Sequence, residues 1–157
     1  MHPSLITGAL VLAALVCAVV GETHTVHFEN FCGSGVPLLI QGQNVLSSGP
    51  DYTSTGPLDS VIAYLQIDSL CGFNGENCTL IETTLINVAP GNVGSLTDIS
   101  LIPPHKFSVS TGFYYIDGCG YQGAVCTSAN CTASSAPQSV LCQTDNLSLA
   151  MTFCAPT

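Results

Sequence analysis

The chain has 157 residues, of which 46% are hydrophobic and only 7% are charged, and its formal net charge at pH 7 is −9. It contains one lysine and no arginine, so it lacks the basic surface that nucleic-acid phosphates or anionic lipid headgroups require. The length suits one domain whose core is large enough to fold by itself.

The chain begins with an apolar stretch that predicts a secretory signal peptide. Residues 10–20 (LVLAALVCAVV) have the length of a signal-peptide hydrophobic region and fall short of the roughly 20 residues that span a bilayer. Small residues at Val19 and Gly21 predict a signal peptide over residues 1–21 and a mature domain over 22–157. A membrane anchor is the competing interpretation. We expect a secreted, extracellular protein without a glycolipid anchor, because the C-terminal FCAPT carries no hydrophobic tail.

Cysteine number supports the same compartment. Cleavage after Gly21 removes Cys17 and reduces nine cysteines to eight. An even count in a secreted chain predicts four disulfides, and counting alone leaves the pairing open among Cys32, Cys71, Cys78, Cys119, Cys126, Cys131, Cys142 and Cys154. Zinc is the rival use for so many cysteines, but the chain contains no CxxC pair. We therefore expect neither a metal nor another cofactor.

Three Asn-X-Ser/Thr sequons predict N-glycosylation. The acceptor residues are Asn77, Asn130 and Asn146. In the first two sequons the central residue is a cysteine, so glycan transfer competes with disulfide closure.

Alternation of apolar and polar residues with a period of two predicts strands along the mature chain. In chain order, we expect strands at residues 25–29, 60–68, 79–88, 97–102, 106–113 and 146–153. In the last of these, the odd-numbered residues form the buried face, and the wet face carries Asn146, Ser148, Ala150 and Thr152. Turn-rich segments at 47–57, 72–77 and 89–95, and a cysteine-rich loop at 118–137, separate the strands. The pattern predicts one all-β domain, an antiparallel β-sandwich.

Four segments, in order, resemble the thaumatin-like family. They are VHFENFC (26–32), TDISLIPPHKFSV (97–109), GCGYQGAVC (118–126) and NLSLAMTFC (146–154). The resemblance implies a small, fungal-type secreted glycoprotein with a thaumatin-like sandwich core and a reduced second lobe. It also implies four disulfides, with the first joining the first and last strands as edges of one sheet: Cys32–Cys154, Cys71–Cys78, Cys119–Cys142 and Cys126–Cys131. Hydrophobins, the other small eight-cysteine class, are rejected because no two cysteines are adjacent.

The resemblance also implies a candidate acidic cleft. Thaumatin-like proteins often carry such a cleft, linked with β-1,3-glucan binding and weak hydrolysis. Glu82 in IETTL and Asp98 in DISL match two of its carboxylates. The family's arginine is absent, and Pro103 or Pro104 stands where a further aspartate follows the DISL strand. Glycoside hydrolysis needs two carboxyls at a defined separation, and the alternative is two solvated carboxylates on sheet surfaces.

Other polar and aromatic residues carry less chemistry. We expect surface roles for His24, His27 and His105, because no nucleophile or metal motif accompanies them. A sugar could contact Asp117 and Gly118 beside Tyr114 and Tyr115, although tyrosines in a sandwich more often serve its core or corners.

We therefore predict a monomeric, non-catalytic, extracellular or cell-wall protein that binds β-glucan or another cell-wall polysaccharide. A weak β-1,3-glucanase using Glu82 and Asp98 is the first alternative. A structural or defence protein acting through an exposed apolar patch is the second. Whether Glu82 and Asp98 converge in one cleft distinguishes the enzyme from the binding protein.

Overall fold

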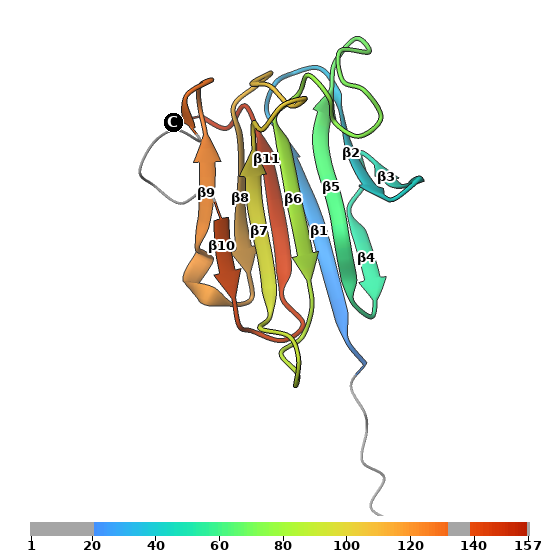
Figure 1. The fold of residues 1–157 in the computed structure, drawn as a ribbon, viewed down its shortest axis with the longest axis vertical. Helices are drawn as coiled ribbons and strands as arrows, with labels where there is room; N and C mark the ends of the chain where they lie inside the picture. Colours follow the sequence, from blue (N-terminus) through green and yellow to red (C-terminus); the bar gives the residue numbers. More distant parts are fainter. Residues whose placement is uncertain (1–20, 132–138, 157) are drawn as a thin grey trace, which may run out of the picture.

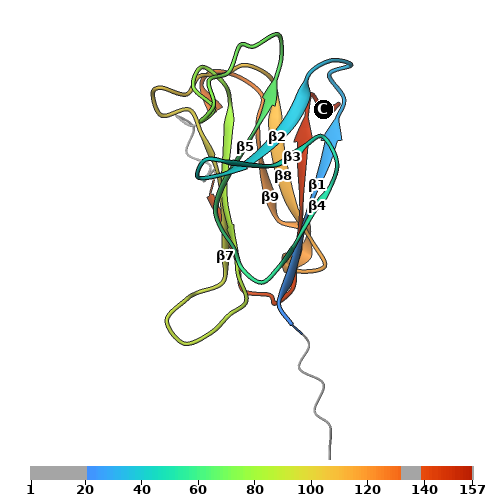
Figure 2. The ribbon, with the colours of Figure 1, turned by 90° about the vertical axis from the view of Figure 1, so that its right-hand side faces the viewer.

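Two β-sheets packed face to face form the described part of the chain, residues 21–131 and 139–156 of a computed structural model (Figures 1 and 2). The five-stranded sheet has the order β4-β1-β11-β8-β9, with β4 (Tyr52–Thr55), β1 (Thr23–Asn30), β11 (Ser148–Phe153), β8 (Thr111–Ile116) and β9 (Gly123–Cys126). The six-stranded sheet has the order β10-β7-β6-β5-β2-β3, with β10 (Ser139–Cys142), β7 (Ser95–Ser100), β6 (Leu80–Leu85), β5 (Leu58–Gln66), β2 (Val36–Gln41) and β3 (Asn44–Ser48). The all-β sandwich expected from the sequence is confirmed.

Within the described residues, the element η1 (Cys119–Tyr121) is a 3-10 turn. In this part of the chain no helix has the length and apolar composition that crossing a membrane requires. The predicted signal peptide, apart from Gly21, lies outside the described residues.

Alternate apolar side chains of both sheets meet between the layers. Leu147, Leu149, Met151 and Phe153 are fully buried there, as the period-two pattern predicts. Ala150, expected on the wet face, is also fully buried, so that part of the prediction is wrong. Its strand lies between β1 and β8, and the larger side chains on those neighbours leave a methyl group no access to water.

The first and last strands of the domain pair in parallel. β1 and β11 align with Val26 opposite Leu149 and Asn30 opposite Phe153, whereas the other strand pairs are antiparallel. Cys32 and Cys154 form a disulfide just beyond this pair. The resemblance implies that these two strands are the edges of their sheet, and this expectation is wrong. β4 lies beyond β1 on one side, and β8 and β9 lie beyond β11 on the other.

The described cysteines form four disulfides: Cys32–Cys154, Cys71–Cys78, Cys119–Cys142 and Cys126–Cys131. These are the four pairs that the resemblance implies. Four disulfides in a chain of this size are typical of extracellular proteins, where the redox conditions keep them oxidised.

Sequence periodicity located several strands correctly but missed others. The segment 106–113 was expected to be one strand, yet β8 begins only at Thr111. Before that point the backbone bonds elsewhere: the Lys106 N–H donates to the Cys78 carbonyl, and the Ser108 N–H donates to the Thr79 hydroxyl. The strands β2, β3, β4, β9 and β10 were not predicted, and β4 and β9 lie inside segments expected to be turn or loop.

A buried polar ladder joins the sheets and fixes the register of β6 against β7. Thr83 lies opposite Thr97, and their hydroxyl oxygens are 2.7 Å apart. From the facing sheet, the Tyr115 hydroxyl lies 2.9 Å from the Thr97 hydroxyl and 2.9 Å from the Val140 carbonyl oxygen. Burial raises the pKa of Tyr115 to about 12, so the phenol stays neutral inside the sandwich. A slip by one residue would separate these hydroxyls and leave them buried without partners.

Removal of the Cys32–Cys154 disulfide is expected to destabilise the fold far more than removal of Cys126–Cys131. The first bridge spans 122 residues of sequence and the second spans 5. Loop-closure entropy then predicts losses of about 5 and about 2 kcal/mol in the free energy of unfolding. Urea unfolding of the Cys32→Ser/Cys154→Ser and Cys126→Ser/Cys131→Ser variants measures both. Equal losses would contradict the assignment of the first bridge as the principal covalent constraint.

Candidate functional site

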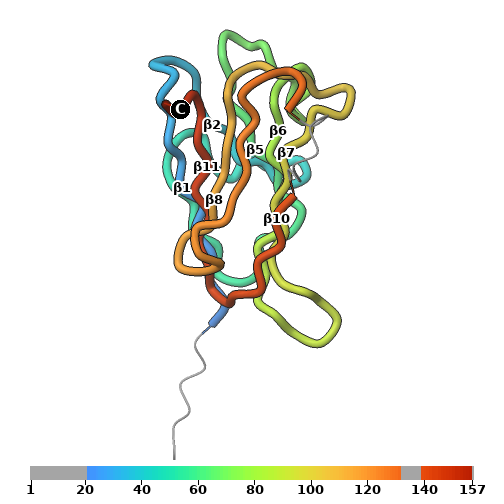
Figure 3. Tube along the Cα trace, turned by 90° about the vertical axis from the view of Figure 1, so that its left-hand side faces the viewer, coloured from blue at the N-terminus to red at the C-terminus, as the bar shows by residue number. Residues whose placement is uncertain are grey.

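A groove of about 750 Å³ lies on the outer face of the six-stranded sheet. Its floor is the outward-facing side chains of β5, β6 and β7, and Ser139 of β10 adds to one side. Residues 91–94, from the loop between β6 and β7, form its rim, and this loop projects beyond the strands in Figure 3. The groove therefore combines a rigid sheet with one loop wall.

Glu82 and Asp98 converge in this groove. They are directly opposite each other on the antiparallel strands β6 and β7, and both line the groove. Residues paired in this way have Cβ atoms about 4.5–5.5 Å apart. Both project outward because the neighbouring pair, Thr83 and Thr97, projects inward to the buried ladder.

A third carboxylate, which sequence reasoning missed, joins them through a β-bulge. The pairing of β5 with β6 shifts between Leu58 and Val61, so Asp59 and Ser60 are both exposed at the groove. The Asp59 carboxylate accepts hydrogen bonds from the hydroxyls of Thr84 at 3.0 Å and Ser60 at 3.1 Å. In the sequence, the polar residues Asp59 and Ser60 lie between the apolar residues Leu58 and Val61. This interruption of the period of two is the sequence signal that indicates a bulge.

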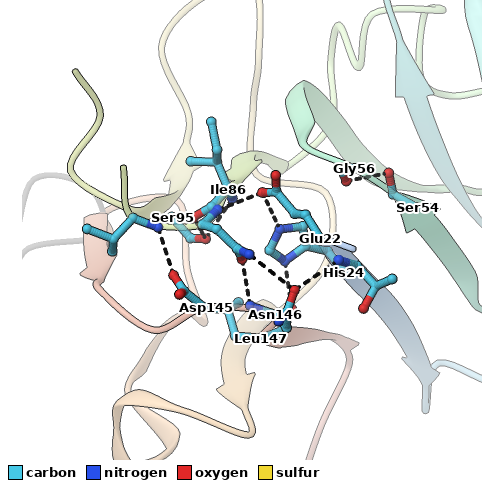
Figure 4. Close-up of polar contacts among 12 residues, drawn as sticks. Glu22, His24, Ser54, Gly56, Ile86, Ser95, Asp145, Asn146 and Leu147 are labelled. Atoms are coloured by element: carbon cyan, nitrogen blue, oxygen red, sulfur yellow. Dashed lines mark hydrogen bonds and ion pairs between the residues drawn. The ribbon is translucent and has the colours of Figure 1, made fainter. Parts of the chain in front are cut away.

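The loop wall is held to the other sheet by side-chain hydrogen bonds (Figure 4). The Glu22 carboxylate accepts from the Asn87 N–H at 2.6 Å, and the Asp145 carboxylate accepts from the Val88 N–H at 2.8 Å. Asn87 and Asn146 bond reciprocally, with the Asn146 N–H 2.7 Å from the Asn87 side-chain oxygen. The loop is therefore anchored at its start by residues from both ends of the domain.

Gly94 lets the loop return close to β10 at its other end. Its φ of +102° lies in the region that favours glycine, and a Cβ there would be 2.5 Å from the Cys142 carbonyl oxygen. A larger residue would displace the rim of the groove.

Asp98 is the less solvated carboxyl of the opposed pair. Burial raises its pKa above the ordinary aspartate value, and a backbone hydrogen bond from Ile99 partly offsets that effect. Glu82, by contrast, is exposed. The groove thus offers one carboxyl that retains its proton more readily and one in contact with water.

The groove suits an uncharged, hydroxyl-rich ligand. The sequence has a single lysine and no arginine, so the site has no guanidinium to bind an anion. None of the described residues that line it is aromatic. The described residues also include no group of three or more His, Cys, Asp or Glu side chains arranged to hold a metal ion.

No known family model matches the chain, and no curated protein is similar to it in sequence.

The remaining candidate residues lie outside the groove. His27 is paired with Asp51 at 2.7 Å on the surface, and His105 bonds the Gly75 carbonyl. His24 was expected at the surface but is buried, with one ring nitrogen 3.0 Å from the Leu147 carbonyl and the other 3.0 Å from the Glu22 carboxylate (Figure 4). It is a structural residue that ties the start of β1 to the turn before β11.

The three sequon asparagines are all exposed, so their positions are compatible with glycans. Asn77 and Asn146 have left-handed φ angles of 64° and 53°, and Asn130 follows β9. Glycosylation stays a prediction for each of them.

Replacement of Glu82 by glutamine is expected to stabilise the fold. Like charges directly opposite on neighbouring strands repel, and removing one is worth about 0.2–1 kcal/mol. The gain should disappear as the pH falls through the raised pKa of Asp98, because the protonated aspartate no longer repels Glu82. Thermal unfolding at several pH values measures this effect. Asp68→Asn, an exposed carboxylate outside the groove, is the control; a gain of equal size there would contradict the pairwise origin.

Proposed function

We propose that the chain is a secreted, glycosylated thaumatin-like protein whose second lobe is small or missing. In this proposal it acts as a monomer at the cell wall and binds β-glucan in the groove without cleaving it. The observation that carries the proposal is the set of three carboxylates, Asp59, Glu82 and Asp98, on one exposed sheet face. The disulfide pairing and the β-sandwich support the family, because both follow the implied pattern.

Carboxylates suit a polysaccharide because each oxygen accepts hydrogen bonds from sugar hydroxyls. Such charge-assisted bonds are stronger than those between neutral groups. Around them, the groove offers the hydroxyls of Ser60, Thr84 and Ser139, and the apolar side chains of Ile62 and Leu96 fit the carbon–hydrogen faces of a pyranose ring. A neutral glucan satisfies both kinds of contact.

Sedimentation with insoluble β-1,3-glucan tests this proposal. Wild type is expected in the pellet, and the Glu82→Gln/Asp98→Asn variant is expected to bind at least about tenfold more weakly, because it loses two charge-assisted acceptors. The control Asp68→Asn keeps its groove and should bind as wild type does. Wild-type protein found entirely in the supernatant with both β-1,3-glucan and chitin would overturn the proposal.

A weak β-1,3-glucanase is the second candidate, and the convergence of Glu82 with Asp98 favours it. Asp98, with its raised pKa, would act as the general acid, and Glu82 would act as the nucleophile or base. Directly opposed strand residues allow the separation of about 5–5.5 Å found in retaining enzymes. Binding remains the first candidate because Glu82 is exposed and no second lobe covers the groove in the described residues.

Hydrolysis of laminarin decides between the two. If the chain is an enzyme, Glu82→Gln is expected to lower the rate by about a hundredfold or more. The wild-type rate should also fall as the pH rises through the raised pKa of Asp98, since the general acid must be protonated. Equal rates in wild type and Glu82→Gln, or none in either, would end the hydrolase proposal.

A further inference from the structure

A second surface of different chemistry lies on the outer face of the five-stranded sheet. The groove is on the outer face of the six-stranded sheet, so the two surfaces are on opposite sides of the sandwich, whose layers are seen edge-on in Figure 2. Here Tyr114 of β8 projects outward, because its neighbours Phe113 and Tyr115 fill the core. Its ring centroid lies 6.4 Å from that of Tyr121 in η1, with the rings tilted by 45°.

Tyr121 is exposed, and its backbone has a left-handed conformation that residues other than glycine rarely adopt. Three successive residues of η1, Cys119, Gly120 and Tyr121, have left-handed φ angles of 51°, 61° and 60°. Residues other than glycine adopt this region at a cost, and such conformations persist only where the surroundings impose them. The Cys119–Cys142 disulfide ties the turn to β10 of the other sheet. The outcome is an aromatic side chain that is 70% exposed.

Tyr114 lies along the sheet instead of standing away from it. Its hydroxyl donates a hydrogen bond to the Glu29 carboxylate at 3.0 Å, and Glu29 is on β1, two strands away. The side chain must therefore cross β11, where Ala150 is directly opposite Tyr114 and fully buried although it faces outward. On the other side, Gly123 is opposite Tyr114, and a Cβ there would collide with the Phe113 carbonyl. Small neighbours thus leave room for a ring laid flat on the strands.

We propose that Tyr121 and Tyr114, with Glu29, form a platform that binds an uncharged saccharide chain separately from the groove. The carbon–hydrogen face of a pyranose ring stacks on an aromatic ring, and its hydroxyls bond to polar groups at the border of the ring. One carboxylate oxygen of Glu29 accepts the hydrogen bond from Tyr114. The other oxygen has no hydrogen bond within the described residues, so it can accept one from a sugar hydroxyl. The hydroxyl of Thr152, which lies opposite Glu29, is a further polar group beside the platform.

Other ligand classes fit this platform less well. The single lysine of the chain, Lys106, lies outside the five-stranded sheet, the chain has no arginine, and the partly exposed histidine of this sheet, His27, is already paired with Asp51, so an anion finds no free counter-charge there. An apolar protein surface would bury the Glu29 carboxylate at high cost. A quaternary ammonium ion prefers enclosure by several aromatic faces, whereas two rings tilted on one open sheet do not surround it.

Calorimetry and amide NMR with laminarihexaose and chitohexaose test the platform. At least one hexaose is expected to bind wild type and shift the amide signals of β8, β9 and η1. Tyr121→Ala should weaken that binding at least about tenfold, since it removes the stacking surface, and Tyr121→Phe should retain most of it. Phe73→Ala, an exposed aromatic on the loop that packs on the other sheet, should bind as wild type does.

The Glu82→Gln/Asp98→Asn variant separates this site from the proposed function of the groove. If it still binds a hexaose with shifts at β8, β9 and η1, the platform stands whatever becomes of the groove. If the shifts are confined to β6, β7 and residues 86–94, the platform is overturned and the groove stands. The proposal would be overturned if no hexaose shifted the amide signals of the platform, or if tetramethylammonium shifted them and the hexaoses did not. Equal hexaose affinity of Tyr121→Ala and wild type would overturn it too.

Discussion

The parallel pairing of β1 with β11, closed by the Cys32–Cys154 disulfide, is the constraint on which the sandwich depends. It joins the first and last strands of the described chain, and the bridge spans 122 residues. The other strands of the five-stranded sheet are added to this pair, with β4 beside β1 and β8 followed by β9 beside β11. A chain with so few charges has little surface electrostatics to select one fold, so apolar burial and cross-links carry the stability.

The groove derives its geometry from the register of β6 and β7. The inward ladder of Thr83 and Thr97 is satisfied by Tyr115 from the facing sheet, so the two strands cannot slip without leaving buried hydroxyls unpaired. The same register places Glu82 against Asp98 on the outer face. The hydrogen bonds of the core therefore decide which carboxylates meet at the surface. The same register brings the two like charges together, so the fold carries the cost of their repulsion.

The two outer faces of the sandwich differ in chemistry although both are made from short strands. The groove face has carboxylates, hydroxyls and aliphatic side chains, with a loop wall anchored through Glu22 and Asp145. The platform face has two tyrosines and one carboxylate, and its exposed ring is held by a turn tied through a disulfide. In both cases the polar groups lie on regular strands or on a cross-linked turn, which fixes their positions and, in the proposed functions, lowers the cost of ordering them on binding.

The sequence by itself determined the fold class and the faces of the long strands, because these follow from a local pattern, the period of two. It also pointed to Glu82 and Asp98, through the resemblance. Only the tertiary structure decided that these two carboxylates are opposite each other, since strand register depends on partners distant in sequence. It likewise buried His24, enclosed Ala150 and exposed Tyr121, because solvent access depends on which neighbours the fold brings alongside each residue.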